Sequence, residues 1–212
     1  MTPAAITTFY QRLAAANPAP QTELEFTDAY TLLVAVVLSA QSTDVGVNKA
    51  TRRLFAAAST PDAMVALGED AVRDHIRTIG LFNTKAKNVV ALSARLVTEH
   101  GGAVPRDRAA LEALPGVGRK TANVVLNTAF GDLTCAVDTH VFRVANRTGL
   151  APGKTVDAVE TAIMARTPAV FLRNAHHWLI LHGRYVCLAR TPRCATCPVV
   201  DLCGFDAKPV MA

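Results

Sequence analysis

Residues 114–122 read Leu114-Pro115-Gly116-Val117-Gly118-Arg119-Lys120-Thr121-Ala122, and the glycine pair in this stretch decides how the surrounding chain folds. Helix-forming residues precede the pair, and the strongly helical residues 119–129 follow it. The glycines allow a tight turn, and the free N–H groups at the start of the second helix can bind one phosphate oxygen. Such a turn holds a nucleic-acid backbone without reading its bases. The alternative is a plain turn between two helices, which is common.

Lys120 lies two residues after Gly118, in the first turn of the expected helix. The positive end of the helix dipole disfavours an ammonium there, and stability alone would favour Asp or Glu. The position therefore indicates either a phosphate contact or a neutral amine that serves as a nucleophile. From the residues alone, phosphate contact and simple exposure to solvent both stay open.

A second motif, Val137-Asp138-Thr139-His140-Val141, follows an apolar stretch and precedes residues with helical periodicity. Asp is a favoured N-cap residue, so Asp138 is expected to begin a helix. A catalytic role is compatible with capping, because the carboxylate still faces the open end of the helix.

Four of the five cysteines stand close together in a C-x6-C-x2-C-x5-C spacing: Cys187, Cys194, Cys197 and Cys203. A local group of this kind indicates a metal site in a reducing compartment rather than a disulfide framework. The four thiolates could hold either zinc or a 4Fe–4S cluster. Paired CxxC motifs are usual for small zinc sites, and the single pair here favours iron–sulfur. The loop after Cys187 carries Arg190 and Arg193 and no acid, which suits contact with a phosphate backbone.

The remaining potential metal ligands form no second set. Cys135 stands alone and is expected to be a small buried hydrophobe. His176, His177 and His182 lie on one expected helix without an acid or cysteine to complete a site, so packing or exposure is the favoured interpretation.

Helical periodicity recurs along the chain, and no segment alternates as a β-strand would. The first helix is indicated by apolar residues at the i, i+3, i+4, i+7 spacing: Ile6, Phe9, Tyr10 and Leu13. The longest apolar run, residues 29–40, is too short to span a membrane and is expected to be a buried helix. Asp62 is expected to cap a short helix that ends at Gly68, and Asn83 to cap another. The fold class is therefore all-α, with about ten helices.

Composition sets broad limits on fold and partner. The chain has 212 residues, half of them hydrophobic, which is enough for one large domain or for two lobes. Lys and Arg exceed Asp and Glu by 22 to 17, for a net charge of +5. This excess favours a polyanionic partner without requiring one.

Taken in order, the glycine turn with Lys120, the Asp138 motif and the four cysteines resemble the endonuclease III family, in the helix-hairpin-helix superfamily of DNA glycosylases. The resemblance extends to Leu38-Ser39-Ala40-Gln41-Ser42-Thr43-Asp44 and to Ile79-Gly80-Leu81-Phe82-Asn83, so it covers nearly the whole chain. It implies two helical lobes that flank a DNA-binding cleft. Residues 22–132 would form a six-helix bundle with the helix-hairpin-helix, and residues 1–21 with 133–212 a lobe around a 4Fe–4S cluster.

The resemblance also implies an activity, that of a bifunctional DNA glycosylase and abasic-site lyase. Lys120 would attack the sugar carbon that bears an oxidised or saturated pyrimidine, and Asp138 would help to deprotonate the amine and stabilise the cationic sugar. β-Elimination through the resulting Schiff base would then cut the strand. The expected partner is double-stranded DNA with damaged bases or abasic sites, bound by a monomer in the bacterial cytoplasm without membrane contact.

Further DNA contacts follow from the same resemblance. Gln41 and Leu81 would fill the gap that the extruded nucleotide leaves, while Gly116 and Gly118 would hold the backbone and His140 would contact DNA or orient the site. Without the resemblance, the alternatives are a solvated turn for Gln41 and a buried apolar contact for Leu81.

Two rival functions share parts of this pattern. An adenine glycosylase shares the hairpin, the aspartate and the cluster, but it lacks a lysine at the position of Lys120 and carries an added C-terminal domain. A non-catalytic DNA-binding module or iron–sulfur redox sensor would use the same hairpin, and the combination of Lys120 with Asp138 disfavours it.

Overall fold

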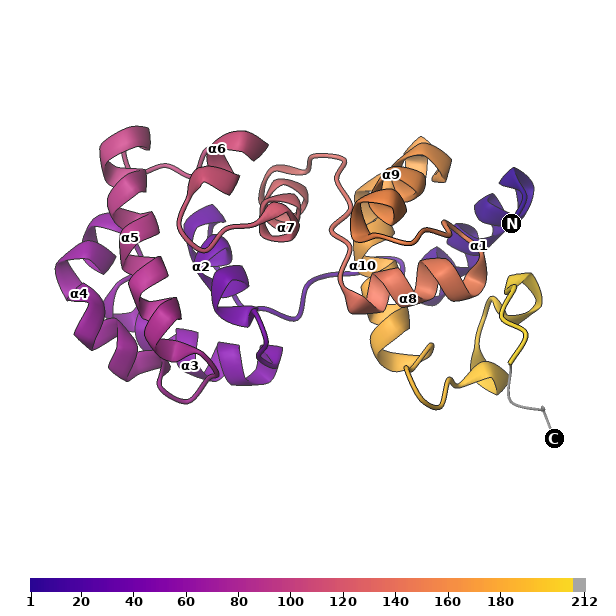
Figure 1. Ribbon diagram of the computed structural model, residues 1–212, viewed down its shortest axis with the longest axis horizontal. Coiled ribbons are helices and arrows are strands. Elements are labelled where there is room, and N and C mark those ends of the chain that lie inside the picture. The colour runs from indigo at the N-terminus through magenta and orange to yellow at the C-terminus, as the bar shows by residue number, and fades with distance from the viewer. Residues whose placement is uncertain (208–212) are drawn as a thin grey trace. The chain divides into compact units, whose positions relative to one another are not determined.

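The structure, a computed structural model, describes residues 1–207. Over this range the chain forms ten α-helices, two short 3₁₀ helices and no β-strand, so the all-α prediction is confirmed (Figure 1). The chain divides into two compact units. We call residues 1–21, together with those described from Leu133 onward, unit 1, and Thr22–Asp132 unit 2. No helix within residues 1–207 combines the length and the apolar character that crossing a membrane would need.

Unit 2 is built around one apolar helix. Its six helices are α2 (Ala29–Ser39), α3 (Asp44–Ala57), α4 (Pro61–Ile76), α5 (Phe82–His100), α6 (Arg108–Ala113) and α7 (Arg119–Phe130). Every residue of α2 from Tyr30 to Leu38 is buried, because the helix packs against α3, α5 and α7. α4 lies along α5 (Figure 1). A helix that is apolar all round needs such surroundings, and the prediction of a buried helix here is confirmed.

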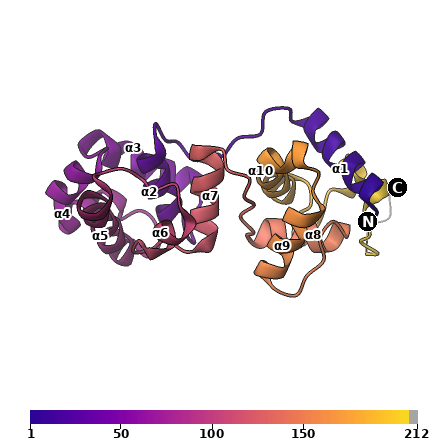
Figure 2. The same ribbon diagram turned by 90° about the horizontal axis from the view of Figure 1, so that it is seen from above.

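Unit 1 is made from both ends of the chain. It holds α1 (Pro3–Ala16), α8 (Thr139–Thr148), α9 (Val156–Arg166), α10 (Ala169–Tyr185) and the 3₁₀ helices η1 (Cys194–Thr196) and η2 (Val200–Leu202). α8 and α1 both pack against α10 (Figure 2). Cys135 is 1% exposed within this core, which confirms the prediction that it is a buried hydrophobe.

The face of α1 that was expected to be apolar is the face that unit 1 buries. Ile6, Phe9, Tyr10 and Leu13 are the buried residues of this helix. The Tyr10 hydroxyl lies 3.0 Å from the Thr167 hydroxyl, and its ring stacks on Phe171. Burial raises the pKa of Tyr10, so the phenol stays neutral and can share a proton with Thr167. The polar end of this large apolar side chain is thus satisfied inside the core.

Two of the expected helix starts are wrong. Thr60, rather than Asp62, caps α4. The expected helix end at Gly68 is confirmed as a break within α4, where Gly68 adopts φ +79°. The N-cap of α5 is Leu81, two residues before Asn83, and it makes no side-chain capping bond. In both places a residue with capping chemistry lies inside the first turn, where the local sequence cannot distinguish it from the cap.

Candidate functional site

The two glycines of the hairpin between α6 and α7 differ in backbone conformation and in the room around them for a side chain. Gly116 adopts φ +78°, and a Cβ added there would lie 2.8 Å from Nδ2 and 3.0 Å from Cβ of Asn88. Gly118 has ordinary extended backbone, and a Cβ there would meet nothing within 4 Å. Gly116 is therefore required by the turn itself, whereas Gly118 leaves the surface over the start of α7 open.

α7 begins without a side-chain cap. Within residues 1–207, seven of the ten α-helices have an N-cap Thr or Asp that accepts a backbone N–H, but α7 starts at Gly118. The first N–H groups of this helix therefore face an open surface, which suits an anion. Lys120 is the second residue of α7 and is exposed, so its amine can reach a group bound at this surface.

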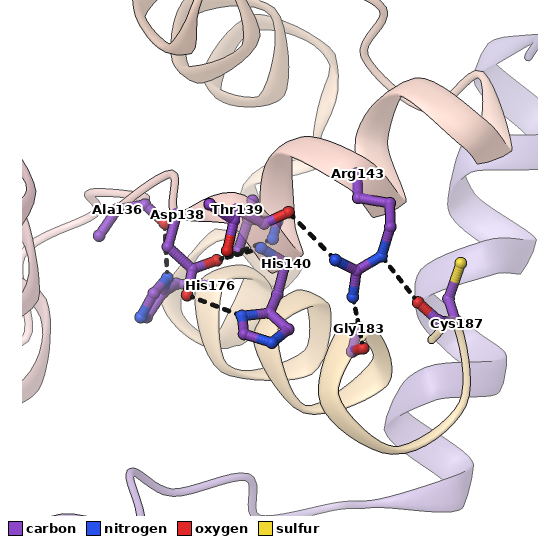
Figure 3. Close-up of polar contacts among 9 residues, drawn as sticks. Ala136, Asp138, Thr139, His140, Arg143, His176, Gly183 and Cys187 are labelled. Atoms are coloured by element: carbon purple, nitrogen blue, oxygen red, sulfur yellow. Dashed lines mark hydrogen bonds and ion pairs between the residues drawn. The ribbon is translucent and has the colours of Figure 1, made fainter. Parts of the chain in front are cut away.

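Asp138 is the N-cap of α8, as predicted. Its Oδ1 accepts hydrogen bonds from the backbone N–H groups of His140 and Val141, each 2.9 Å long. Its Oδ2 lies 3.2 Å from Nδ1 of the His140 ring (Figure 3). The Asp138 side chain is 13% exposed. The carboxylate is thus held in one orientation with a small part of its surface open.

The helices around Asp138 are packed closely by two residues of α10. A Cβ at Gly183 would lie 2.8 Å from Cβ of His140, so this position has room only for glycine. The buried His176 ring places Nδ1 2.8 Å from the Ala136 carbonyl (Figure 3). A carbonyl oxygen only accepts, so His176 donates from Nδ1 and fixes the backbone two residues before Asp138.

Two arginines of α8 connect this helix to the cysteine loop, and sequence reasoning did not single them out. Arg143 donates to the Cys187 carbonyl at 2.9 Å and to the Gly183 carbonyl at 2.7 Å (Figure 3). Arg147 donates to the carbonyls of Leu188 and Ala189 at 2.7 and 2.6 Å. Their spacing of four residues places both on one face of α8 and was the signal that could have found them.

The four predicted ligand cysteines line one pocket, together with Arg147 and His182. None forms a disulfide. His182 Nε2 lies 3.7 Å from Sγ of Cys197, and burial lowers the pKa of His182 to about 4, so the ring is neutral near pH 7. Burial likewise raises the pKa of the Cys197 thiol. The three histidines that were expected to pack or be exposed are all buried, but His182 borders the cysteine pocket.

Four cysteine thiols border this pocket, and such a donor set fits a metal group held by thiolates, either zinc or a 4Fe–4S cluster. Within residues 1–207, no three His, Cys, Asp or Glu side chains are arranged so that they could hold a metal ion. Arg190 and Arg193, on the loop between the first two cysteines, are exposed.

Gln41 and Leu81 share a backbone feature that sets them apart. They are the two non-glycine residues with positive φ in the described part of the chain, at +53° and +58°. A left-handed residue of this kind is strained by about 1–2 kcal/mol. Gln41 is exposed, and Leu81 is 57% exposed. The buried contact considered for Leu81 is therefore wrong, and two strained turns present their side chains to solvent.

Comparison with known proteins gives consistent matches over the chain. The family described as "HhH-GPD superfamily base excision DNA repair protein" matches residues 34–169. Endonuclease III of Escherichia coli (strain K12) is 59% identical over 197 residues, which is 93% of each protein. Endonuclease III of Haemophilus influenzae is 56% identical over the same share of both.

Solved structures agree with these matches. The chain is similar to "Structure of a Trapped Endonuclease III-DNA Covalent Intermediate: Estranged-Adenine Complex", with a TM-score of 0.90 and 43% identity over 96% of each chain. "Structure of a non-covalent Endonuclease III-DNA Complex" gives the same TM-score and coverage at 44% identity. A thermostable thymine-DNA glycosylase, with a TM-score of 0.85 at 24% identity, shares the fold.

Proposed function

The chain belongs to the HhH-GPD superfamily of base excision DNA repair proteins and is a bifunctional DNA glycosylase and abasic-site lyase; from this premise we propose that Lys120 is its nucleophile. One observation carries the proposal. A similar protein, 43% identical over 96% of each chain, has been trapped as a covalent intermediate with DNA. Lys120 supports it from this chain's side, because it is exposed at an uncapped helix start that suits a bound phosphate.

In the proposed reaction the neutral amine of Lys120 attacks C1′ of the damaged nucleotide. The bond from C1′ to the base breaks, and the base leaves with its electron pair and takes up a proton. The nitrogen lone pair then breaks the bond from C1′ to the ring oxygen O4′, which takes up a proton, and the opened sugar is left joined to Lys120 as a Schiff base. Loss of a proton from C2′ expels the 3′ phosphate by β-elimination, and water finally releases the sugar from the lysine.

Asp138 would receive the proton of the attacking amine and stabilise positive charge on the sugar. Hydrogen-bonding contacts from two backbone N–H groups and from His140 hold its carboxylate before any substrate arrives. A charged group that is already oriented needs no reorganisation during the reaction, which is the main condition for electrostatic stabilisation. His140 thus orients the site through Asp138.

Four positions of unit 2 would hold the DNA. The hairpin around Gly116 and Gly118 would bind a backbone phosphate at the start of α7. Gln41 and Leu81 would enter the duplex when the damaged nucleotide is extruded and replace its stacking. Their exposure in strained turns supports this role, because strain of this kind collects at functional sites.

Cys187, Cys194, Cys197 and Cys203 would hold a 4Fe–4S cluster. When bound, the cluster would cross-link the ends of the loop that carries Arg190 and Arg193, and these exposed arginines would contact phosphates. Iron and sulfide analysis with a visible absorbance band at about 400 nm would test the assignment. Stoichiometric zinc in a colourless protein would contradict it.

The proposed substrates are oxidised or saturated pyrimidines and abasic sites in double-stranded DNA, and the protein would act as a monomer. The relatives from Escherichia coli and Haemophilus influenzae are bacterial proteins, which supports a place in the bacterial cytoplasm. Oligonucleotides that each carry one defined lesion would establish the preference, and light scattering with and without DNA would establish the oligomeric state.

The nucleophile is tested by borohydride trapping on duplex DNA with one abasic site. Wild-type protein should form a covalent adduct that survives denaturing electrophoresis, and Lys120→Ala should form none. Lys87→Ala removes an exposed lysine of α5 and is the matched control, which should trap as wild type does. Peptide mapping of the wild-type adduct should place the sugar on Lys120. Efficient trapping by Lys120→Ala would assign the chemistry to another amine.

A further inference from the structure

Lys85 is unlike every other lysine in residues 1–207, because it is buried, at 4% exposed, while the others are exposed. It lies in the first turn of α5, where the helix dipole disfavours a positive charge. No carboxylate in the described chain contacts its ammonium, and burial lowers its pKa. Three unfavourable conditions at one residue indicate that its position serves something other than stability.

The contacts of Lys85 lead to both of the strained turns. Its Nζ donates to the Ser42 hydroxyl at 2.9 Å, and Ser42 directly follows Gln41. Its backbone N–H donates to the carbonyl of Leu81 at 3.0 Å. One residue is therefore hydrogen-bonded to Leu81 through its main chain and to the neighbour of Gln41 through its side chain.

The two turns also approach each other directly. A Cβ added at Gly80 would lie 3.6 Å from the carbonyl oxygen of Gln41. Gly80 precedes Leu81, so the backbone next to Leu81 lies close to the Gln41 carbonyl within unit 2. The hydrogen bond from Lys85 to Ser42 crosses between the two turns at this approach.

We propose that Lys85 is a positioning residue that locks the Gln41 turn to the Leu81 turn, so that both side chains enter the duplex as one preformed unit. The proposal rests on the proposed role of these two residues in filling the gap left by an extruded nucleotide. A preformed pair matters only when a stacked, paired nucleotide must be extruded. A single-stranded substrate needs no such help.

Lys85→Met keeps the length and the apolar stem of the side chain and removes the hydrogen bond. Its cleavage rate should be compared with wild type on two substrates, a duplex and a single strand, that carry the same abasic site. The loss on the duplex should exceed the loss on the single strand by about ten-fold or more. A 2-aminopurine base beside the lesion, whose fluorescence rises on unstacking, should respond to wild-type protein and respond weakly to the variant.

Ser42→Ala removes the same bond from the other side and keeps the proposal testable if Lys85→Met does not fold. It should give the same shift in substrate ratio, and the double variant should add little to either single one, as expected for two halves of one interaction. Ser93→Ala is the matched control, since Ser93 is a buried hydroxyl on α5 that bonds the Tyr30 hydroxyl at 2.7 Å. It should leave the ratio of the two rates as in wild type.

Equal losses on both substrates, or no loss on either, in Lys85→Met and in Ser42→Ala would overturn the positioning role. The failure of the proposed function would look different. In that case wild-type protein would neither cleave nor become trapped on either substrate, and the inference about Lys85 would fall with it.

Discussion

The N-termini of α7 and α8 carry side chains of opposite charge. α7 begins at Gly118 without a side-chain cap and carries the exposed Lys120 in its first turn. α8 begins at Asp138, whose carboxylate caps the helix and faces the His140 ring. Both ends have the positive pole of a helix dipole, which stabilises the anion and disfavours the cation.

This difference separates a group that has to react from a group that has to stay in place. The Asp138 carboxylate is held by the same bonds that stabilise α8, so its orientation comes with the fold. Lys120 contributes nothing of this kind to α7, because the helix dipole disfavours a positive charge at this end. The position of Lys120 suits a nucleophile, because an amine attacks in its neutral form. The position of Asp138 suits an electrostatic stabiliser, because its charge is already oriented.

The largest effect is expected from Asp138, where charge and capping can be separated. Asp138→Asn keeps a good N-cap and loses the charge, so abasic-site cleavage should fall by roughly 10²–10⁴ while the unfolding free energy changes little. Asp138→Ala should lose the same activity and about 1 kcal/mol of stability in addition. Single-turnover cleavage and urea denaturation measure the two quantities.

The control for Asp138 is another capping aspartate, Asp107, which accepts the Ala110 N–H at 2.8 Å at the start of α6. Asp107→Ala should lose about the same stability and keep its cleavage rate. Full activity in Asp138→Asn would reduce Asp138 to a helix cap, and the contrast between the two helix starts would lose its functional meaning.

A second prediction separates the two hairpin glycines. Gly116→Ala forces a side chain into a left-handed backbone and against Asn88, and should destabilise the protein by about 1–3 kcal/mol. Gly118→Ala should lower stability by less than about 1 kcal/mol, yet it places a methyl group on the surface that would bind phosphate, and so should weaken DNA binding. Thermal unfolding and fluorescence anisotropy distinguish these outcomes. Equal stability losses without any change in binding would show that the α7 start is only a turn.

A third prediction asks whether Lys120 is a phosphate contact or a reactive amine. Joint replacement of Arg190 and Arg193 by Ala should lower the slope of log affinity against log salt by about two, one unit for each lost contact. Lys120→Ala should leave this slope nearly unchanged if Lys120 is the reactive amine and does not contact a phosphate. If Lys120→Ala instead lowers the slope by about one unit, Lys120 is a phosphate contact.

The smallest effect is a gain. Lys120→Glu places a favoured charge at the start of α7 and should stabilise the protein by about 0.3–1 kcal/mol at low salt, while it removes trapping on abasic DNA. Lys87→Glu, further along α5, is the control and should change stability less. The gain in Lys120→Glu should shrink as salt is added. A stability loss would contradict the view that Lys120 sits where an ammonium is disfavoured.

Local pattern was sufficient for much of the fold. The four-residue face of α1, the apolar α2 and the Asp138 cap could be predicted because each depends on residues within one or two turns. The class of the whole chain followed, since no segment alternated as a strand. Asp62 and Asn83 were wrong as caps for the same local reason, because capping residues also occur in the first turn and one sequence gives no means to tell them apart.

The site needed contacts that join distant residues. Lys85 and Ser42 are 43 positions apart, Arg147 and Leu188 are 41, and no periodicity links them. The left-handed backbone of Leu81 is likewise invisible in sequence, because Leu is among the residues that rarely adopt it. The sequence shows where a lysine or arginine places a positive charge. The partner to which that side chain donates its hydrogen bonds can be seen only in the folded structure.

The composition of unit 1 from both chain ends has a consequence for synthesis. α1 is synthesised before unit 2, but α10, which covers its apolar face, is made only after the whole of unit 2. At about 5–20 residues per second, α1 waits on the order of 10 seconds with Phe9 and Tyr10 uncovered, while unit 2 can already fold as a continuous segment. The cysteines emerge later still. Until α10 is made, a nascent chain thus combines a folded bundle with a helix whose apolar face has no partner, and such a face is exposed to aggregation.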